Sequence, residues 1–354
     1  MDEKGRGGYR SLFWPLVLIG AGVIGLLATT GALSRENFVV LVRLWPVFLI
    51  LIGLDVLFGR RSPAIGALLG LGAIALVIGL MLVGPSLGWG DNLEVKTGRF
   101  SEPLGAATSA LVRLNLSSGP TEITALSDSA DLIDAELNYT GEIDFEVSGD
   151  GEKAVSLGER DAGAAFFFDW FTGDDDERRW DIGLSPQVPL DLQVNGGSGS
   201  AELDLRALQL AGLDVDVGSG SVDGRLPALE SRYDARVDGG SGSCRLDVAD
   251  GAAAGLEIDV GSGSIDVSAG ADVDLSVRVQ GGSGSLSIDV PEDAAVRLDV
   301  RDSGSGSVSV PSWLERTRSG DRDEGTWETP GYASADHKIE IVIDELGSGS
   351  VQVR

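Results

Sequence analysis

The stretch Arg236–Val248 reads RVDGGSGSCRLDV, and the tetrapeptide Gly-Ser-Gly-Ser at its centre occurs seven times in the C-terminal half of the chain. Successive copies are 21, 22, 21, 21, 22 and 43 residues apart, so the last gap spans one skipped copy. A fixed period of this size predicts stacked repeat units, each of which covers the face of the next. The copies end at Ser200, Ser221, Ser243, Ser264, Ser285, Ser307 and Ser350.

The segments on both sides of these turns alternate between apolar and polar residues. In the quoted stretch, Val237 precedes the turn, and Cys244, Leu246 and Val248 follow it at every second position. This period of two is typical of a strand with one buried face. We therefore expect an all-β repeat domain over residues 180–354, a β-solenoid or β-roll of 21-residue units with its turns along one edge. Because the turns alternate in apparent length, a coil of 43 residues is a second interpretation.

The turn residues have a predicted structural role. A sharp corner requires a positive φ, which glycine reaches without penalty. Gly242→Val is therefore expected to destabilise the domain by roughly 1–3 kcal/mol. Serine hydroxyls can join neighbouring rungs, so Ser241→Ala is expected to cost about 1 kcal/mol, the value of one hydrogen bond.

The N-terminal part of the chain has a different character. Three apolar segments, Leu12–Leu33, Phe38–Phe58 and Ala64–Val83, are each about 20 residues long, enough to cross a bilayer core of ~30 Å. We therefore predict three transmembrane helices within residues 11–90, after a cytoplasmic stretch at residues 1–10.

Basic residues lie on alternate sides of these segments. Because such flanks stay in the cytoplasm, three spans would place residue 91 onward outside the cell membrane. A cytoplasmic β domain is the alternative, since two more basic residues follow the third segment. The basic flanks are formed by Lys4, Arg6, Arg10, Arg60 and Arg61.

Composition excludes several classes of function. The net charge is −28, and since the first 90 residues carry +3, the remainder carries −31. Such an acidic domain is not expected to bind nucleic acid. Cys244 is alone and is predicted to be a small buried hydrophobe, and His337 is the only histidine. We find no catalytic, cofactor-binding or metal-binding motif, and so predict a protein that is not an enzyme and has no cofactor.

Two inserts interrupt the repeat. Residues 91–179 are expected to form irregular first rungs and a cap, and Trp313–Lys338 lies where a turn is missing. The segment Phe166–Trp180, FFFDWFTGDDDERRW, is the candidate contact with a partner or membrane, although a cap over the open core is the simpler interpretation. The candidate contact residues are Phe166, Phe167, Phe168, Trp170 and Phe171.

Three longer sequence segments resemble a known protein family. LWPVFLILIGLDVLF at Leu44–Phe58 resembles the membrane region of the LiaI/LiaF group of bacterial envelope-stress proteins. WDIGLSPQVPLDLQVNGGSGSAELDL at Trp180–Leu205 is similar to the LiaF-type toastrack β-repeat, which also occurs in candidate adhesins. PGYASADHKIEIVIDELGSGSVQV at Pro330–Val353 resembles the closing rungs of that domain.

The resemblance implies a non-enzymatic membrane protein that senses or modulates cell-envelope stress. In some members this happens by restraining a sensor kinase, so a sensor histidine kinase and the lipid bilayer are the expected partners. The alternative is a surface scaffold or adhesin that presents a long β face. The sequence leaves the oligomeric state open.

Overall fold

The computed structural model describes residues 13–29, 45–54, 63–83, 95–160, 178–320 and 323–354. The chain forms two compact units, a helical one in the N-terminal part and a β unit that begins at Val95. The candidate contact residues Phe166, Phe167, Phe168, Trp170 and Phe171 lie outside the described residues. The predicted division of the chain into residues 1–10, 11–90, 91–179 and 180–354 remains a prediction.

The helical unit contains α1 (Phe13–Thr29), α3 (Trp45–Leu54) and α4 (Pro63–Val83). Each helix has a proline in its first turn, where the missing N–H costs nothing. Helix α1 meets α4 at Gly20, where a β-carbon would lie 2.8 Å from Cγ1 of Ile74. Such close approach is what a small residue permits between helices.

Among the described residues, no helix is both long enough and apolar enough to cross a membrane. Parts of the predicted spans Leu12–Leu33 and Phe38–Phe58 lie outside these ranges. The number of spans therefore stays a prediction.

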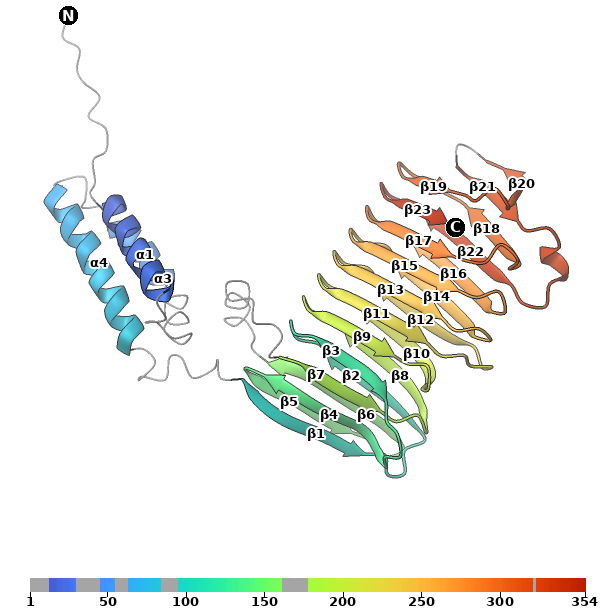
Figure 1. Ribbon diagram of the computed structural model, residues 1–354, viewed down its shortest axis with the longest axis horizontal. Coiled ribbons are helices and arrows are strands. Elements are labelled where there is room, and N and C mark those ends of the chain that lie inside the picture. Colours follow the sequence, from blue (N-terminus) through green and yellow to red (C-terminus); the bar gives the residue numbers. More distant parts are fainter. Residues whose placement is uncertain (1–12, 30–44, 55–62, 84–94, 161–177, 321–322) are drawn as a thin grey trace, which may run out of the picture. The chain divides into compact units, whose positions relative to one another are not determined.

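The β unit consists of two long sheets that face each other (Figure 1). Over the described residues, the first sheet has 11 strands and the second has 12. In spatial order, the first sheet contains β1 (Lys96–Pro103), β4 (Asp131–Tyr139), β7 (Trp180–Leu184), β3 (Thr121–Ala125), β9 (Ser200–Asp204), β11 (Ser221–Leu226), β13 (Ser243–Val248), β15 (Ser264–Ala269), β17 (Ser285–Asp289), β23 (Ser350–Val353) and β19 (Ser307–Ser309). The second contains β20 (Glu315–Ser319), β21 (Gly325–Glu328), β18 (Val296–Val300), β22 (Ile339–Glu345), β16 (Asp274–Gln280), β14 (Ala253–Asp259), β12 (Tyr233–Asp238), β10 (Gln209–Asp216), β8 (Pro189–Asn195), β2 (Ser109–Asn115), β6 (Glu152–Arg160) and β5 (Glu142–Ser148).

The register between strands fixes the size of one coil. Ser221 of β11 lies opposite Ser243 of β13, which lies opposite Ser264 of β15, and all three strands are parallel. Equivalent turn residues therefore stack directly, and one coil contains 21 or 22 residues. The interpretation of a coil of 43 residues is wrong.

The alternation in apparent turn length has a side-chain cause. Val217 and Val260 are buried at the second position of their turns, whereas Gly239 occupies the same place in the turn between them. A β-carbon on Gly239 would lie 2.6 Å from the carbonyl oxygen of Val260 in the next rung and 3.0 Å from Cδ1 of Ile265. The glycine thus permits the close approach of the next rung, while the turns keep the same number of residues.

The core lies between the two sheets and runs through the whole β unit. Inward positions such as Leu192, Val237, Leu246 and Ile288 are fully buried. Burying one such aliphatic side chain contributes roughly 1.5–3 kcal/mol. The alternation read from the sequence therefore corresponds to the observed inside and outside of each strand.

The C-terminal rung is out of sequence order. Ile339 of β22 pairs on one side with Leu275 of β16 and on the other with Val296 of β18. In the first sheet, β23 likewise lies between β17 and β19. The chain therefore leaves one rung's width open after β17 and fills it with its last residues. The insert Trp313–Lys338 supplies the return path, with the antiparallel pair β20–β21 and the short 3-10 helix η4 (Tyr332–Ser334).

The opposite end of the β unit is also irregular. The rung formed by β2 and β3 precedes β8 and β9 in space, and β4 pairs antiparallel with both β1 and β7. At the outermost strands, the ring of Phe100 lies 6.2 Å from Tyr139 and 5.8 Å from Phe145. These aromatic rings close the space between β1 and β5.

Candidate interaction surfaces

The stacked turns form one edge of the β unit. In the turn Asp238–Ser243, Gly240 has φ +49°, and its N–H donates to Oδ1 of Asp238 at 3.3 Å. The N–H of Ser241 donates to the carbonyl of Gly218 in the rung below at 2.8 Å. The parallel hydrogen-bond ladder therefore continues around the corner through backbone groups rather than through serine hydroxyls.

Two expectations about this edge are corrected. The left-handed backbone lies at Gly240 and not at Gly242, two residues earlier in the turn than expected. Gly242 is needed for another reason, since a β-carbon there would overlap the carbonyl oxygen of Gly220. The inter-rung hydrogen bond expected of the Ser241 hydroxyl is absent, because the backbone N–H makes that link.

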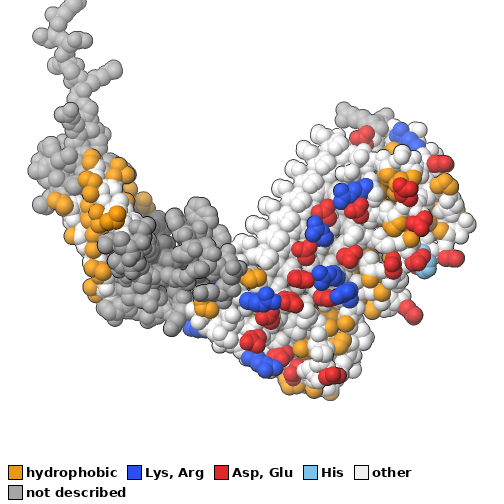
Figure 2. Space-filling model, viewed as in Figure 1, with side chains coloured by type: hydrophobic (Ala, Val, Ile, Leu, Met, Phe, Trp, Pro, Cys, Tyr) orange, Lys and Arg blue, Asp and Glu red, His pale blue; other side chains and the backbone are white. Residues whose placement is uncertain are grey.

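The outward faces of both sheets carry interspersed charges. Figure 2 shows acidic and basic side chains mixed over the displayed face, beside a band of uncharged atoms along the turn edge. On the first sheet, Arg245 Nη1 lies 3.5 Å from Asp223 Oδ1. On the second, Arg236 Nη1 lies 3.2 Å from Glu257 Oε1. Each pair is about half exposed, so its contribution to stability is small.

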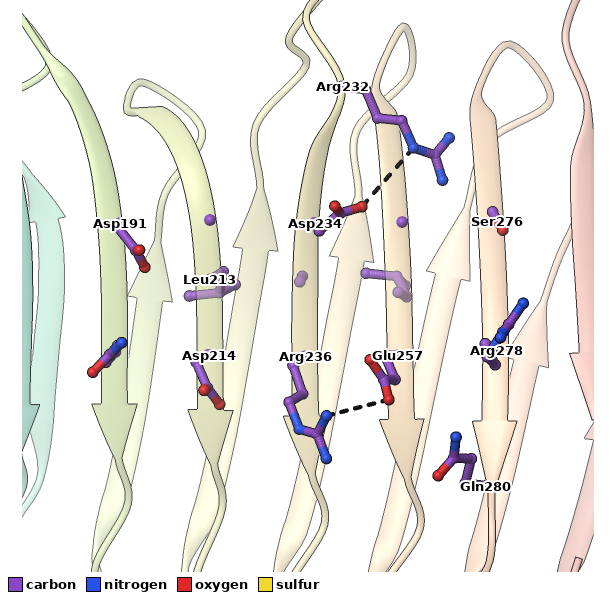
Figure 3. A pocket seen from close by; sticks show the side chains of 15 residues that line it. Asp191, Leu213, Asp214, Arg232, Asp234, Arg236, Glu257, Ser276, Arg278 and Gln280 are labelled. Carbon is purple, nitrogen blue, oxygen red and sulfur yellow. Dashed lines mark hydrogen bonds and ion pairs between the residues drawn. The ribbon is translucent and has the colours of Figure 1, made fainter. Parts of the chain in front are cut away.

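The outer face of the second sheet contains a shallow depression of about 560 Å³ (Figure 3). It crosses β8, β10, β12, β14 and β16, and two glycines in mid-strand form part of its floor. The remaining lining side chains are mostly charged or polar. The lining residues are Asp191, Gln193, Gly212, Leu213, Asp214, Arg232, Asp234, Ala235, Arg236, Gly255, Leu256, Glu257, Ser276, Arg278 and Gln280.

The residues that carry reactive groups do not converge. Cys244 is 2% exposed, as predicted for a buried hydrophobe, and burial together with the charges of Asp223 and Asp266 raises its pKa to about 12. His337 lies at the surface, where its Nδ1 is 3.4 Å from Asp274 Oδ2. Across the described ranges, no group of three or more His, Cys, Asp or Glu residues could hold a metal ion. The depression was not predicted from the sequence. The available signal was Gly212 and Gly255, which interrupt otherwise regular strands.

The C-terminal end of the aromatic insert can be placed. Strand β6 ends at Arg160 in the second sheet, and β7 begins at Trp180 in the first. Trp180 is fully buried, and Arg178 is 2% exposed and donates through Nη2 to the Ser118 hydroxyl. The C-terminal end of the insert is therefore held firmly in the β unit.

Comparison with protein families agrees with this architecture. Residues 13–100 match the family model of the LiaF transmembrane domain, and residues 91–247 match that of the N-terminal domain of toast_rack (DUF2154). The match to the LiaF transmembrane domain indicates membrane association, and the fold shows a β-repeat domain. The chain is LiaF-like, with a LiaF transmembrane domain followed by a toast-rack domain, and the resemblance seen in its sequence is confirmed. Neither family is a family of enzymes.

Three solved structures have a distant similarity to this chain. A candidate cell adhesion protein from Clostridium sporogenes has 15% identity and a TM-score of 0.34, covering 73% of this chain and 99% of its own. A candidate adhesin from Bacteroides fragilis has 13% identity and a TM-score of 0.35, covering 74% and 97%. A third, from Parabacteroides distasonis, has 11% identity and a TM-score of 0.30, covering 75% and 98%. No curated protein matches the chain.

Proposed function

We propose that this protein is a non-enzymatic integral membrane protein that senses or modulates cell-envelope stress through protein–protein contacts. The observation that carries the proposal is the joining of a LiaF transmembrane domain to a toast-rack domain in one chain. In this proposal the helices contact a sensor histidine kinase in the bilayer, and the β domain receives the signal.

The geometry of the β unit supports such a role. Stacked repeats give an extended, regular surface, which repeat proteins use to recognise partners. Charged side chains such as Arg236 and Arg245 lie on the outward faces, while the one thiol is buried. Such a surface suits binding, whereas nothing in its described part brings a nucleophile and a base together.

The proposal places three spans in residues 11–90 and the β domain outside the cytoplasmic membrane. A thiol-labelling experiment tests the side. In a Cys244→Ser background, a cysteine at Arg245, whose side chain is 67% exposed, should react with a membrane-impermeant reagent in intact cells. Labelling only after lysis would show that the domain is cytoplasmic.

Crosslinking in native membranes tests the partner. We expect a sensor kinase among the crosslinked proteins, and a raised kinase response when the gene is deleted. Serine in place of the outward-facing rings among Phe166, Phe167, Phe168, Trp170 and Phe171 should weaken this crosslinking and leave the melting temperature nearly unchanged. A large loss of stability would instead identify these residues as a structural cap.

The long, regular outer faces also fit a second function, a surface scaffold or adhesin. This alternative predicts that deletion leaves every kinase response unchanged and reduces attachment of cells to a surface. The two functions are therefore distinguished by one deletion strain and two measurements.

A further inference from the structure

We infer that the depression on the outer face of the second sheet binds an uncharged polysaccharide, laid along the axis on which the rungs stack. The inference deepens the proposed sensing role by naming a ligand class for the β domain. It does not depend on the link to a kinase, since it rests on the residues of the depression alone.

The first argument is the charge of the depression. Four carboxylates and three guanidinium groups line it, so its net charge is −1, although residues 91–354 together carry −31. A polycation would be drawn to the more acidic parts of the domain, and a polyanion requires a positive surface. The local balance therefore favours a ligand that is polar and uncharged.

The second argument is the order of donors and acceptors. One row across the strands reads Asp214, Arg236, Glu257 and Arg278, in register on β10, β12, β14 and β16. Carboxylates only accept hydrogen bonds and guanidinium groups only donate them. Sugar hydroxyls do both, so neighbouring hydroxyls on one ring can bind an acceptor and a donor on adjacent rungs.

The third argument is the placement of glycines in the floor of the depression. The neighbouring row reads Asp191, Gly212, Asp234 and Gly255, so a glycine recurs on every second rung. A glycine inside a strand often marks a bulge or a close approach by a ligand or another backbone. Gly212 directly follows a register shift between β10 and β8, whereas β14 keeps a regular register at Gly255. Two rungs span about 9.6 Å at ~4.8 Å per strand, a length close to that of a disaccharide unit.

The two glycines differ in the space above them. At Gly255 a β-carbon would overlap Oδ1 of Asp234, so that glycine makes room for a side chain of the protein. At Gly212 the nearest atom to a β-carbon would be Oδ1 of Asp191 at 3.4 Å, an ordinary contact. The open space of the depression is therefore above Gly212, which is the site at which to block it.

An extended peptide is a poorer occupant of this surface. Strand addition requires a free sheet edge, where backbone N–H and C=O groups are unpaired. The strands under the depression pair on both sides, as β12 does with β10 and β14. A ligand on this face must therefore be bound by side chains, and polar side chains can form hydrogen bonds with sugar hydroxyls.

Calorimetric titration of the full-length protein in detergent micelles tests the inference. The probes are hexa-N-acetylchitohexaose, cellohexaose and mannohexaose, which are uncharged oligosaccharides of different linkage or substitution. We expect saturable binding of at least one. Gly212→Val should weaken it tenfold or more without lowering the melting temperature, because valine fills the space and favours a strand.

A pair of charge-neutral double variants supplies the matched control. Arg236→Ser with Glu257→Ser removes an ion pair inside the depression and should weaken binding tenfold or more. Arg245→Ser with Asp223→Ser removes an equivalent pair on the other sheet and should leave binding unchanged.

Three results would overturn the inference: no saturable binding of any of these sugars, equal binding by wild type and Gly212→Val, or equal loss in both double variants. If Gly212→Val lowers the melting temperature, Gly212→Ala and the double variants decide the question. Kinase crosslinking that persists in a variant unable to bind sugar would leave the proposed function standing, so the two failures can be told apart.

Discussion

The carbonyl oxygen of Gly220 occupies the space that a β-carbon on Gly242 would need. The same relationship recurs from rung to rung, since Gly263 lies equally close to the carbonyl of Gly242. The turns of this protein are therefore stacked so closely that the fifth residue of each turn has no room for a side chain.

Gly242→Ala is expected to lower the free energy of unfolding by about 1–3 kcal/mol, because the added methyl group forces neighbouring backbones apart. Thermal and denaturant unfolding of the full-length protein, followed by the circular dichroism of its strands, measures this. Gly212→Ala is the matched control, since its methyl group meets only ordinary contacts and should cost nothing. Equal stability of the two variants would show that the turns can separate without cost.

Ser241→Ala is expected to change stability by less than about 0.5 kcal/mol, as for a surface substitution without a partner. The link between rungs at this residue is its backbone N–H, which the variant keeps. The same unfolding measurement applies. A loss near 1 kcal/mol, the value expected for a hydroxyl hydrogen bond, would contradict this account.

Ile341→Ala is expected to destabilise the protein by about 2–5 kcal/mol, because the side chain is fully buried in the intercalated rung. Hydrogen exchange should also rise selectively in β18 and β19, whose parallel partners are β22 and β23. Ile288→Ala, at an equally buried residue of β17, is the control for the loss of a core isoleucine. Uniform exchange in both variants would refute the special role of the last rung.

Cys244 is expected to resist alkylation at pH 8 in the folded protein. Burial and two nearby carboxylates raise its pKa to about 12, so almost no thiolate is present. Since this pKa is raised by folding, the contribution to stability is complete below about pH 8.5 and is lost as the pH rises toward 12. Mass spectrometry after a timed reaction measures the alkylation of Cys244. Arg245→Cys in a Cys244→Ser background is the comparison with an exposed thiol. Equal rates for the two thiols would show that Cys244 is accessible.

Gly20→Ile is expected to separate α1 from α4, because its side chain would collide with Ile74. Oxidative crosslinking between cysteines introduced one turn away on each helix should fall. Gly22→Ile is the control, since a β-carbon there has no atom within 4 Å. Unchanged crosslinking in Gly20→Ile would mean that the helices do not pack through this residue.

The period and alternation of the sequence were sufficient to predict the repeat architecture. Inward residues such as Leu246 and Ile288 follow directly from a period of two, because each strand has one buried face. The size of one coil could not be predicted, because Gly239 in the place of a valine made turns of equal length look unequal.

The order of the last rungs could not be predicted for a physical reason. Leu275, Val296 and Ile339 all present the same inward pattern, so either later strand could pair with β16 in the same register. The depression was also hidden, because it arises from Gly212 and its neighbours on four other strands, which are far apart in the sequence. The aromatic insert at Phe166–Trp180 could be singled out by composition, but its contacts remain a prediction.

The position of β22 and β23 has a consequence for how the protein is made. During synthesis, each rung from β8 to β17 can add to the one before it as the chain emerges. The strands β18 and β19 cannot take their final place in this way, because β22 and β23, which separate them from β16 and β17, are synthesised after them. A truncation before Ile339 would therefore leave β16 and β17 with unpaired edges where β22 and β23 belong.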